Sequence, residues 1–321
     1  MGENGSAYTQ RINRVLDYIA DHPDGDLSLS RLARVACFSQ FHFHRIFHSL
    51  TGETLNNHVR RVRLERAASL LKASPEARIT DVALEAGFPG LAEFSRAFKA
   101  HFGFNASDWD RKSPLPNSKN CKAPESFPAY SEQELESWRK NQRLEVRLTK
   151  FPACRYVYIR VHDPYGNQRL VDAYYKIMRW LSDQQVDVRD VVIVGMSQDD
   201  PAVTPKEKCR YDMGAAFPLE KTNGGLLSAI VRERGGSLRH APSETQGLST
   251  RQIPAFQAAV LRGVGDLASV DRAWQYLYRC WLPHSRYEPA ELPAMQAFVR
   301  LPEEIGWMLF DLQACVPVRQ F

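Results

Sequence analysis

The sequence predicts a multidomain protein in which an all-α domain with two helix-turn-helix motifs precedes an α+β domain built of two β-α-β-β repeats. Three observations predict this organisation. Residues 28–110 contain a helical pattern that recurs after about 50 residues, and residues 145–321 contain a mixed pattern that recurs after about 100 residues. Between them, residues 111–134 carry four prolines among polar side chains, which is typical of a linker. We therefore expect a helical domain at 7–111, a linker at 112–144 and a mixed domain at 145–321.

The composition is that of an ordinary globular protein. The chain has 321 residues, 44% hydrophobic and 25% charged, so it can form two or three domains with their own cores. No apolar run approaches the length of a transmembrane helix and the N-terminal residues lack the apolar segment of a signal peptide, so we expect a cytoplasmic protein without membrane contact. The six cysteines form no C-x-x-C pair, which favours reduced thiols. The net charge of +5 permits a nucleic-acid partner without requiring one.

The first repeat consists of two short helices joined by a tight turn. The run LARVACF (32–38) returns as VALEAGF (82–88), and FHRIFHSLTG (43–52) returns as FSRAFKAHFG (94–103). Ser28 and Thr80 are the expected N-caps of the first helix in each copy. Gly87, with Cys37 at the matching place, marks the turn. Two copies are too few for a solenoid, so helix-turn-helix motifs are the better interpretation.

The second helix of each motif has one apolar face. The predicted core positions are Phe43, Ile46, Phe47 and Leu50 in the first copy and Phe94, Ala97, Phe98 and His101 in the second. Between the copies, residues 55–71 form a helical run about 25 Å long, which would hold the motifs roughly one turn of DNA apart. Its core-facing residues are Val59, Val62, Ala67, Leu70 and Leu71, and its arginines are Arg60, Arg61, Arg63 and Arg66. A solvated face is the favoured interpretation of these arginines, and phosphate contact is the alternative.

The second repeat alternates strands and helices. A strand at 155–161, a helix at 170–181 and strands at 191–196 and 211–217 form the first unit. A strand at 256–263, a helix at 270–282 and strands at 294–299 and 310–318 form the second, and each helix ends in Trp-Leu. Such a pairing creates a cleft between the halves, where ligands tend to bind. The segment 219–247 separates the units and suggests no role of its own.

Two parts of the sequence resemble known families. Residues 7–111 resemble the AraC/XylS family of transcription regulators through LSRLARVACFSQFHFHRIFHSLTGETLNNHVRRVRLERAASLL and ITDVALEAGFPGLAEFSRAFKAHFG. Residues 145–321 resemble the GyrI-like effector-binding domain through VGMSQDDPAVTPKEKCRYDMG, AWQYLYRCWLPHS and the closing VPV. The two resemblances imply a regulator of the Rob type, with a DNA-reading domain in front and a small-molecule sensor behind.

The helix at 39–50 is the expected reading helix. Its candidate DNA contacts are Ser39, Gln40, Phe41, His44 and Arg45. Arginine can bind guanine bidentately, glutamine can bind adenine, and an aromatic ring can contact a thymine methyl group. The second motif offers Leu91, Glu93, Arg96 and Lys99 as candidates, of which only the arginine is a strong one. We therefore expect sequence specificity mainly from the first helix and backbone contacts from the second.

Two patterns that resemble metal sites favour other interpretations. His44 and His48 are four residues apart, a spacing that can bind a metal on one helix face. A zinc site needs three or four ligands, and the second copy replaces both histidines. His42 is expected to be a hydrogen-bonded packing residue beside the core. Asp199 and Asp200, in QDDP, favour turn chemistry over a metal pair. We expect no metal and no cofactor.

The sensor domain is rich in aromatic side chains, and its candidate ligand contacts are Trp274, Tyr278, Gln296 and Phe298. The GyrI-like resemblance implies a pocket glutamate in a P-x-x-E-x-Y run. Here that run reads Pro293 to Phe298, with Gln296 at the glutamate position. An amide removes the negative charge that would pair with a lipophilic cation, so a neutral ligand gains ground, although aromatic walls also suit cations.

The sequence thus predicts a sequence-specific transcription regulator that binds double-stranded DNA and a small aromatic or amphipathic effector, with RNA polymerase as a further expected partner. Both motifs lie in one chain, so the sequence allows a monomer or a homodimer. The alternatives are a GyrI-like domain that acts as a hydrolase or as a protein-interaction module. An amide at Gln296 cannot act as a general base and no G-x-S-x-G run is present, so we expect no enzyme.

Overall fold

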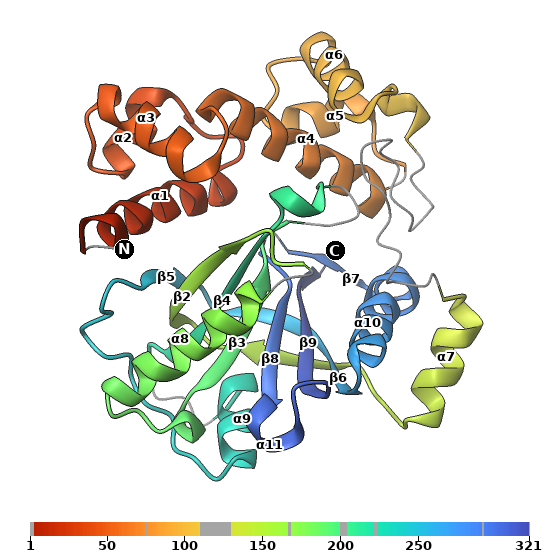
Figure 1. The fold of residues 1–321 in the computed structure, drawn as a ribbon. Helices are drawn as coiled ribbons and strands as arrows, with labels where there is room; N and C mark the ends of the chain where they lie inside the picture. The colour runs from red at the N-terminus through yellow and green to blue at the C-terminus, as the bar shows by residue number, and fades with distance from the viewer. Residues whose placement is uncertain are drawn as a thin grey trace. The chain divides into compact units, whose positions relative to one another are not determined.

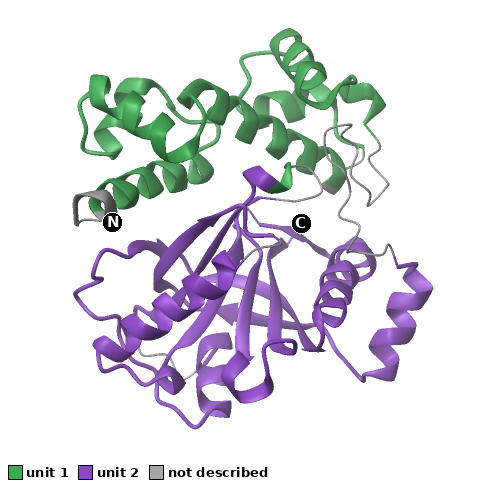
Figure 2. Ribbon diagram, viewed as in Figure 1, with its two compact units in different colours: residues 1–123, 200–206 green, residues 124–199, 207–321 purple. Residues whose placement is uncertain are grey.

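The computed structural model describes residues 3–74, 76–109, 130–165, 168–199, 204–220, 224–290 and 292–320. The chain forms two compact units, residues 1–123 with 200–206 and residues 124–199 with 207–321 (Figure 2). Residues 112–129 of the expected linker and Asp200 of the QDDP turn lie outside the described residues. Each unit is described by itself.

The N-terminal unit is all-α, as predicted. Its helices are α1 (Glu3–Asp21), α2 (Leu29–Val35), α3 (Gln40–Thr51), α4 (Leu55–Ala73), α5 (Ile79–Glu85), α6 (Leu91–Phe102) and the 3-10 turn η1 (Ala106–Asp108) (Figure 1). The pairs α2–α3 and α5–α6 are the two helix-turn-helix motifs, and both turns have a left-handed residue at the predicted place, Cys37 with φ +54° and Gly87 with φ +86°.

The caps and cores of the motifs follow the prediction with three exceptions. Ser28 caps α2, but α5 begins two residues earlier than expected and its N-cap is Arg78, so Thr80 lies inside the helix. Phe43 and Phe47 are fully buried, whereas Leu50, in the last turn of α3, is 37% exposed. His101, expected in the second core, is only half-buried, and Phe102 is fully buried instead.

Helix α4 belongs to both motifs. Leu55, at its start, joins the core of the first motif together with residues of α1, α2 and α3. Leu64, Ala67, Ala68 and Leu71 join the core of the second motif. Leu70, predicted to face the core, is half-buried at its edge. One rigid helix therefore carries both hydrophobic cores.

The C-terminal unit is built on one antiparallel sheet. Its strands are β1 (Arg147–Phe151), β2 (Cys154–His162), β3 (Val192–Ser197), β4 (Arg210–Pro218), β5 (Ser249–Ile253), β6 (Phe256–Gly265), β7 (Tyr287–Pro289), β8 (Met295–Arg300) and β9 (Phe310–Gln320). Their order is β1-β6-β9-β8-β3-β4-β2-β5, and β7 pairs with β9. The two predicted repeats are β2-α8-β3-β4, with α8 at Arg169–Asp183, and β6-α10-β8-β9, with α10 at Leu267–Gln275. The repeats meet in the middle of the sheet, where β3 pairs with β8.

Helices cover both faces of this sheet. Helices α8 and α10 lie on one face, over a core that includes Ile177, Ala273 and Leu312. The opposite face is covered by α9 (Leu226–Glu233), whose Leu227, Ile230 and Val231 pack on strand residues of a second core. This helix belongs to the segment 219–247, for which the sequence suggested no role. The segment supplies the third layer of the domain.

Two elements differ from the predicted pattern. The range expected as a linker contains helix α7 (Glu132–Asn141), which begins with a capping box between Ser131 and Glu134. Its Leu135 is fully buried in the core beneath α8 and α10. The helix predicted at 270–282 is α-helical only as far as Gln275, continues as a π-helix at Tyr276–Trp281 and ends in the 3-10 turn η5 (Leu282–His284).

Three short elements complete the described structure: η2 (Val188–Asp190), η3 (Lys206–Lys208) and α11 (Pro302–Ile305). Among the residues that the structure describes, no helix is both long enough and apolar enough to span a bilayer.

Candidate functional site

Helix α3 exposes the predicted reading face. Its N-cap Ser39 accepts a hydrogen bond from the backbone N–H of His42 at 3.4 Å, and Gly52 ends the helix in the left-handed conformation. Phe43 and Phe47 anchor the inner side of the helix. The predicted contacts Ser39, Gln40, Phe41, His44 and Arg45 are all exposed together with His48. His42 is also exposed, so its predicted packing role is wrong, because it lies at the solvent side of the first turn.

Phe41 is the outstanding residue of this face. Its side chain is 87% exposed, the highest value among the large hydrophobic residues described. An exposed phenylalanine does not stabilise the free protein, because a ring of this size contributes about 1.5–3 kcal/mol only when it is buried. Arg45 follows it by one helical turn, so a ring and a guanidinium lie next to each other on the same side. This is a face suited to a partner with both apolar and hydrogen-bonding edges.

Helix α6 offers a weaker version of the same face. Leu91, Glu93, Arg96 and Lys99 are exposed as predicted, and Leu91 is 42% exposed. Its N-cap is Gly90, which provides no side-chain hydrogen bond where the first motif has Ser39. Phe94 and Phe98 are fully buried and repeat the anchoring of α3. The two motifs therefore share a scaffold and differ in what they present.

Arg63 of α4 joins the two motifs. Its Nε donates to the backbone carbonyl of Pro23, 3.0 Å away in the loop between α1 and α2. The turn of the second motif packs against the same place, because a Cβ on Gly87 would lie 2.4 Å from the Pro23 carbonyl oxygen and 2.7 Å from Arg63 Nε. Burial lowers the pKa of Arg63 despite the nearby charges of Glu93 and Asp24. Parts of both motifs thus meet around one guanidinium.

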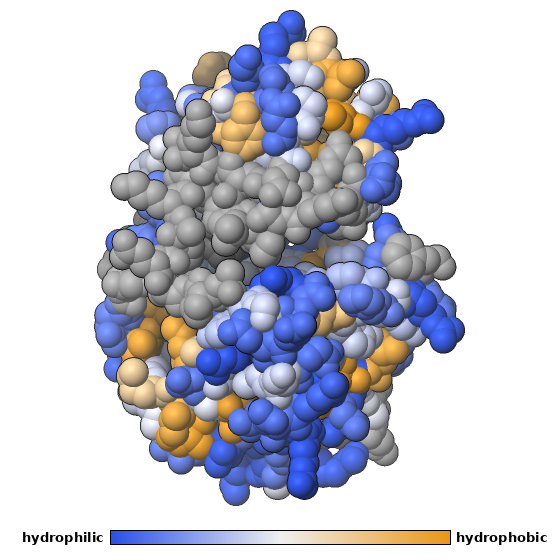
Figure 3. All heavy atoms as spheres, turned by 90° about the vertical axis from the view of Figure 1, so that its right-hand side faces the viewer, coloured by the Kyte–Doolittle hydropathy of each residue, from blue (hydrophilic) through white to orange (hydrophobic). Residues whose placement is uncertain are grey.

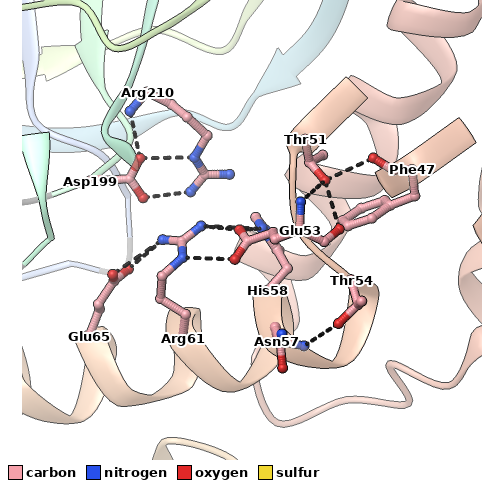
Figure 4. A network of polar contacts seen from close by, with 10 residues as sticks. All are labelled: Phe47, Thr51, Glu53, Thr54, Asn57, His58, Arg61, Glu65, Asp199 and Arg210. Atoms are coloured by element: carbon pink, nitrogen blue, oxygen red, sulfur yellow. Dashed lines mark hydrogen bonds and ion pairs between the residues drawn. The ribbon is translucent and has the colours of Figure 1, made fainter. Parts of the chain in front are cut away.

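Arg61 has a structural role as well. It donates to Glu53 at 2.7 Å and to Glu65 at 3.0 Å, and Nδ1 of His58 lies 2.7 Å from Glu53 (Figure 4). Burial of Glu53 opposes its charged form, but hydrogen bonds from His58 and Arg61 outweigh it and lower the pKa of Glu53 to about 2. Of the four arginines of α4, Arg61 is buried and Arg63 is half-buried, so neither belongs to a solvated face. Arg60 is the exposed one.

A polar pair lies on the sheet face beneath α8 and α10. The hydroxyl of Tyr211, on β4, donates to Oε1 of Gln296, on β8, at 2.8 Å. Gly195, on the strand between them, allows this contact, because a Cβ there would lie 1.8 Å from the Tyr211 hydroxyl oxygen. Burial raises the pKa of Tyr211, which keeps the hydroxyl protonated as the donor. Gln296 itself is half-buried.

The other predicted ligand contacts surround this face unequally. Trp274 and Tyr278 stack at 6.2 Å between ring centroids, and Tyr278 is 42% exposed. Phe298 lies on the same side of β8 as Gln296 but is only 6% exposed, so it is part of the core. Sequence reasoning missed Tyr211 and Gly195. The glycine inside a strongly apolar strand was a signal for a close approach of another group.

No metal site is present among the residues that the structure describes. Asp199, considered as a metal ligand, forms a bidentate ion pair with Arg210, with distances of 2.8 and 2.6 Å (Figure 4). Within the described ranges, no group of three or more His, Cys, Asp or Glu side chains is arranged to hold a metal ion. His44 and His48 are exposed side chains of the α3 face.

Comparison with known proteins assigns both parts of the chain. Residues 32–112 match the model of a helix-turn-helix domain, and residues 144–304 match that of the GyrI-like small molecule binding domain. Regulatory protein SoxS of Salmonella typhimurium is 30% identical over 103 residues, which are 32% of this chain and 95% of SoxS. An uncharacterized HTH-type transcriptional regulator of Haemophilus influenzae is 35% identical over 104 residues, which are 32% of this chain and 34% of that protein.

Among solved structures, the EcmrR C-terminal domain is similar over 56% of this chain and 99% of that domain. Its TM-score is 0.40 and its sequence identity is 11%. The helix-turn-helix model begins within α2 and includes all of the second motif, and the GyrI-like model covers the sheet domain from β1 to β8 and ends before β9. The chain therefore belongs to the AraC-type helix-turn-helix transcription regulators and, through its C-terminal half, to the family of GyrI-like small molecule binding domains.

Proposed function

We propose that the chain reads a specific DNA sequence mainly with α3 and supports this reading with α6. The observation that carries the proposal is the outward face of α3, where Phe41 is 87% exposed beside Arg45 and the polar residues at the helix start. A helix that enters the major groove uses its N-terminal residues on base edges. Arginine offers a bidentate contact to guanine, and the ring offers an apolar contact to a thymine methyl group.

Helix α6 is assigned a supporting role. Its exposed start has Leu91 and Glu93, which offer neither a positive charge nor a bidentate amide, and Glu93 is repelled by phosphate. Arg96 and Lys99 can bind phosphate oxygens, which positions a protein on the duplex without reading its sequence. The arrangement supports one sequence-specific motif and one positioning motif in the same chain.

The experiment that tests this proposal is selection of bound duplexes from a random DNA pool by the full chain. We expect the selected duplexes to share one sequence element about half a turn of DNA long. A nuclease footprint of the bound chain should extend beyond this element on one side, over bases that show no consensus. Affinity for the selected site should fall steeply with salt, because several phosphate contacts release counterions. A pool that stays random after repeated rounds contradicts sequence-specific reading.

We propose further that the C-terminal domain binds its effector on the sheet face that carries Gln296, and that the effector offers a hydrogen-bond acceptor. The hydroxyl of Tyr211 already donates a hydrogen bond to Oε1 of Gln296 at 2.8 Å. The amide NH₂ is then the group that Gln296 can direct to a ligand, and an NH₂ group only donates. Trp274 and Tyr278, stacked on the helix above this face, supply apolar surface for an aromatic body. A neutral aromatic carbonyl compound combines these features.

The substitution Gln296→Glu is expected to remove the preference of the C-terminal domain for a ligand that offers a hydrogen-bond acceptor. Acetophenone should bind the full chain about 3–10-fold more tightly than ethylbenzene, because one neutral hydrogen bond contributes about 0.5–1.5 kcal/mol. In the variant, a carboxylate repels the carbonyl oxygen and the two affinities should become equal. Dissociation constants from titration calorimetry measure both. Gln257→Glu, at an exposed position of β6, is the control for the added charge. A preference for acetophenone that survives in Gln296→Glu contradicts the proposal.

A catalytic role for the same residues finds no support in their chemistry. The side chain at 296 is an amide, which cannot accept a proton as a general base. Tyr211 is held as a hydrogen-bond donor to it. Both motifs lie in one chain, so a monomer as well as a homodimer could hold a duplex. RNA polymerase is the further partner expected of a regulator that binds DNA.

A further inference from the structure

The helix on the second half of the sheet departs from the internal repeat near its end. Ala173 of α8 and Ala273 of α10 are both buried in the same core. The chain has one residue more between Ala273 and Trp281 than between Ala173 and Trp180. The structure accommodates the extra residue in the π-helical segment Tyr276–Trp281, whereas α8 stays regular through Trp180. Such π segments are rare and are found often at functional sites.

The two matching tryptophans have different surroundings. Trp180 is 3% exposed and packs edge-on against Phe217 in the core. Trp281 is half-buried, stacks on Tyr287 and lines a cavity of about 380 Å³. That volume is within the range of small-molecule pockets. The other lining residues come from α7 and from the end of the π segment and η5: Glu132, Glu136, Tyr276, Cys280, His284 and Ser285. None of them lies on β3, β4 or β8, so this cavity is separate from the Gln296 face.

The cavity has a negative wall and an aromatic wall. Glu132 and Glu136 are one turn apart on α7, so they lie on the same side of that helix. Glu136 accepts from the Tyr276 hydroxyl at 2.9 Å and from Arg139 at 3.0 Å, and the first of these bonds lowers the pKa of Glu136. Glu132 is exposed and forms no hydrogen bond or ion pair within the described part of the chain. The Glu136 carboxylate is therefore held in place, and the Glu132 carboxylate is available to a ligand.

Cys280 of the π-helical segment lines the cavity together with the two glutamates. Cys280, between the two walls, is 8% exposed. Burial raises the pKa of its thiol, the charges of Glu132 and Glu136 raise it further, and the charge of Arg279 opposes them. Burial is the largest cause of this shift, and the two carboxylates add to it.

We propose that the cavity between α7 and the π-helical segment binds an organic cation with an aromatic or other apolar body. Its ammonium group would lie between Glu132 and the edge of Glu136, within reach of the Trp281 ring face, where cation–π attraction adds to the ionic one. Its apolar body would lie along Tyr276 and Trp281. A metal ion does not fit, because the described residues contain no group of three metal-ligating side chains.

The surface around the cavity favours a small ligand over a protein partner. The face of the C-terminal unit that carries α7 is mainly hydrophilic, with apolar side chains only in separate small areas (Figure 3). Protein-docking faces have a continuous apolar centre. Because α7 supplies the negative wall, a bound cation would also strengthen the packing of α7 on the domain.

Binding of 2-phenylethylamine, which is protonated at neutral pH, tests the proposal with the full chain. We expect it to quench tryptophan fluorescence saturably and to bind at least about fivefold more tightly than 2-phenylethanol, its neutral analogue, because the carboxylates contribute only to the cation. Glu132→Gln should weaken phenylethylamine about 2–5-fold and leave phenylethanol unchanged. Because Glu132 is exposed, the Glu132→Gln variant is expected to have the same unfolding temperature as the wild-type chain.

Two control variants locate the site. Glu207→Gln removes an exposed carboxylate from η3 and should leave the affinity for phenylethylamine unchanged. Gln257→Glu adds a carboxylate at an exposed position of β6 and should also leave it unchanged. Because no lining residue of the cavity lies on β8, failure of one proposal does not affect the other. Equal affinities for the amine and the alcohol, or an affinity that Glu132→Gln does not alter, would overturn the cavity proposal.

Discussion

Arg45→Ala is expected to weaken binding to the selected DNA site by about 10–100-fold, because a bidentate contact to guanine is worth about 1–3 kcal/mol. The side chain lies on the exposed face of α3 and contributes nothing to the core of its motif. Loss of affinity would therefore report a lost DNA contact and not a damaged fold. Affinity for a random duplex should fall only by the small amount due to one positive charge.

Arg96→Ala is the matched control, since Arg96 occupies the same place in the second motif. We expect a loss of about two- to fivefold that is similar for selected and random duplexes. Phe41→Ala should behave like Arg45→Ala in affinity but should leave the salt dependence unchanged, because it removes no charge. Fluorescence anisotropy at several salt concentrations measures these quantities. Equal losses for Arg45, Phe41 and Arg96 would overturn the division of labour between α3 and α6.

Gly87→Ala is expected to destabilise the N-terminal domain by about 2–4 kcal/mol. The residue has φ +86°, and a left-handed conformation costs a residue with a side chain about 1–3 kcal/mol. The added Cβ would also lie 2.4 Å from the carbonyl oxygen of Pro23, where Arg63 donates its hydrogen bond. The backbone of Pro23 cannot move aside as the end of a flexible side chain can. The turn at residue 87 must therefore shift away from the first motif.

Urea denaturation followed by helical circular dichroism measures this loss. The internal repeat provides an opposite control, because Cys37 occupies the matching turn with φ +54°. Cys37→Gly relieves the conformational cost there and should change stability by less than about 1 kcal/mol, with the gain offset by unfolded-state entropy. A Gly87→Ala chain that unfolds at the wild-type midpoint would contradict the packing described around Arg63.

The helical domain could be predicted in detail because its information is local. The 3.6-residue periodicity fixed the inner sides of α3 and α6, and the repeated turn located Cys37 and Gly87. The errors have local causes too. Leu50 was assigned to the core by periodicity alone, which does not tell where neighbouring helices end. His42 was placed beside the core for the same reason, although its side chain is exposed.

The C-terminal domain shows where sequence reasoning stops. Its repeats were visible because each strand and helix has its own pattern, but the edges β1, β5 and β7 were not. Helix α7 was hidden in a polar segment, since it buries one leucine and gives little periodicity. The pair Tyr211–Gln296 joins residues 85 positions apart, and no pattern along a chain records such a contact. Gln296 itself was identified only through resemblance to a family.

The coverage of the sheet by α9 has a consequence for how a ligand could act. Along β8 the side chains alternate, so Gln296 lies beneath α8 and α10 while Met295 and Ala297 belong to the core beneath α9. A strand is nearly inextensible, and both cores are closely packed. An effector that pulls on Gln296 must therefore move its two neighbours against α9. Ligand binding on the face beneath α8 and α10 would therefore alter the packing on the face beneath α9 through a single strand.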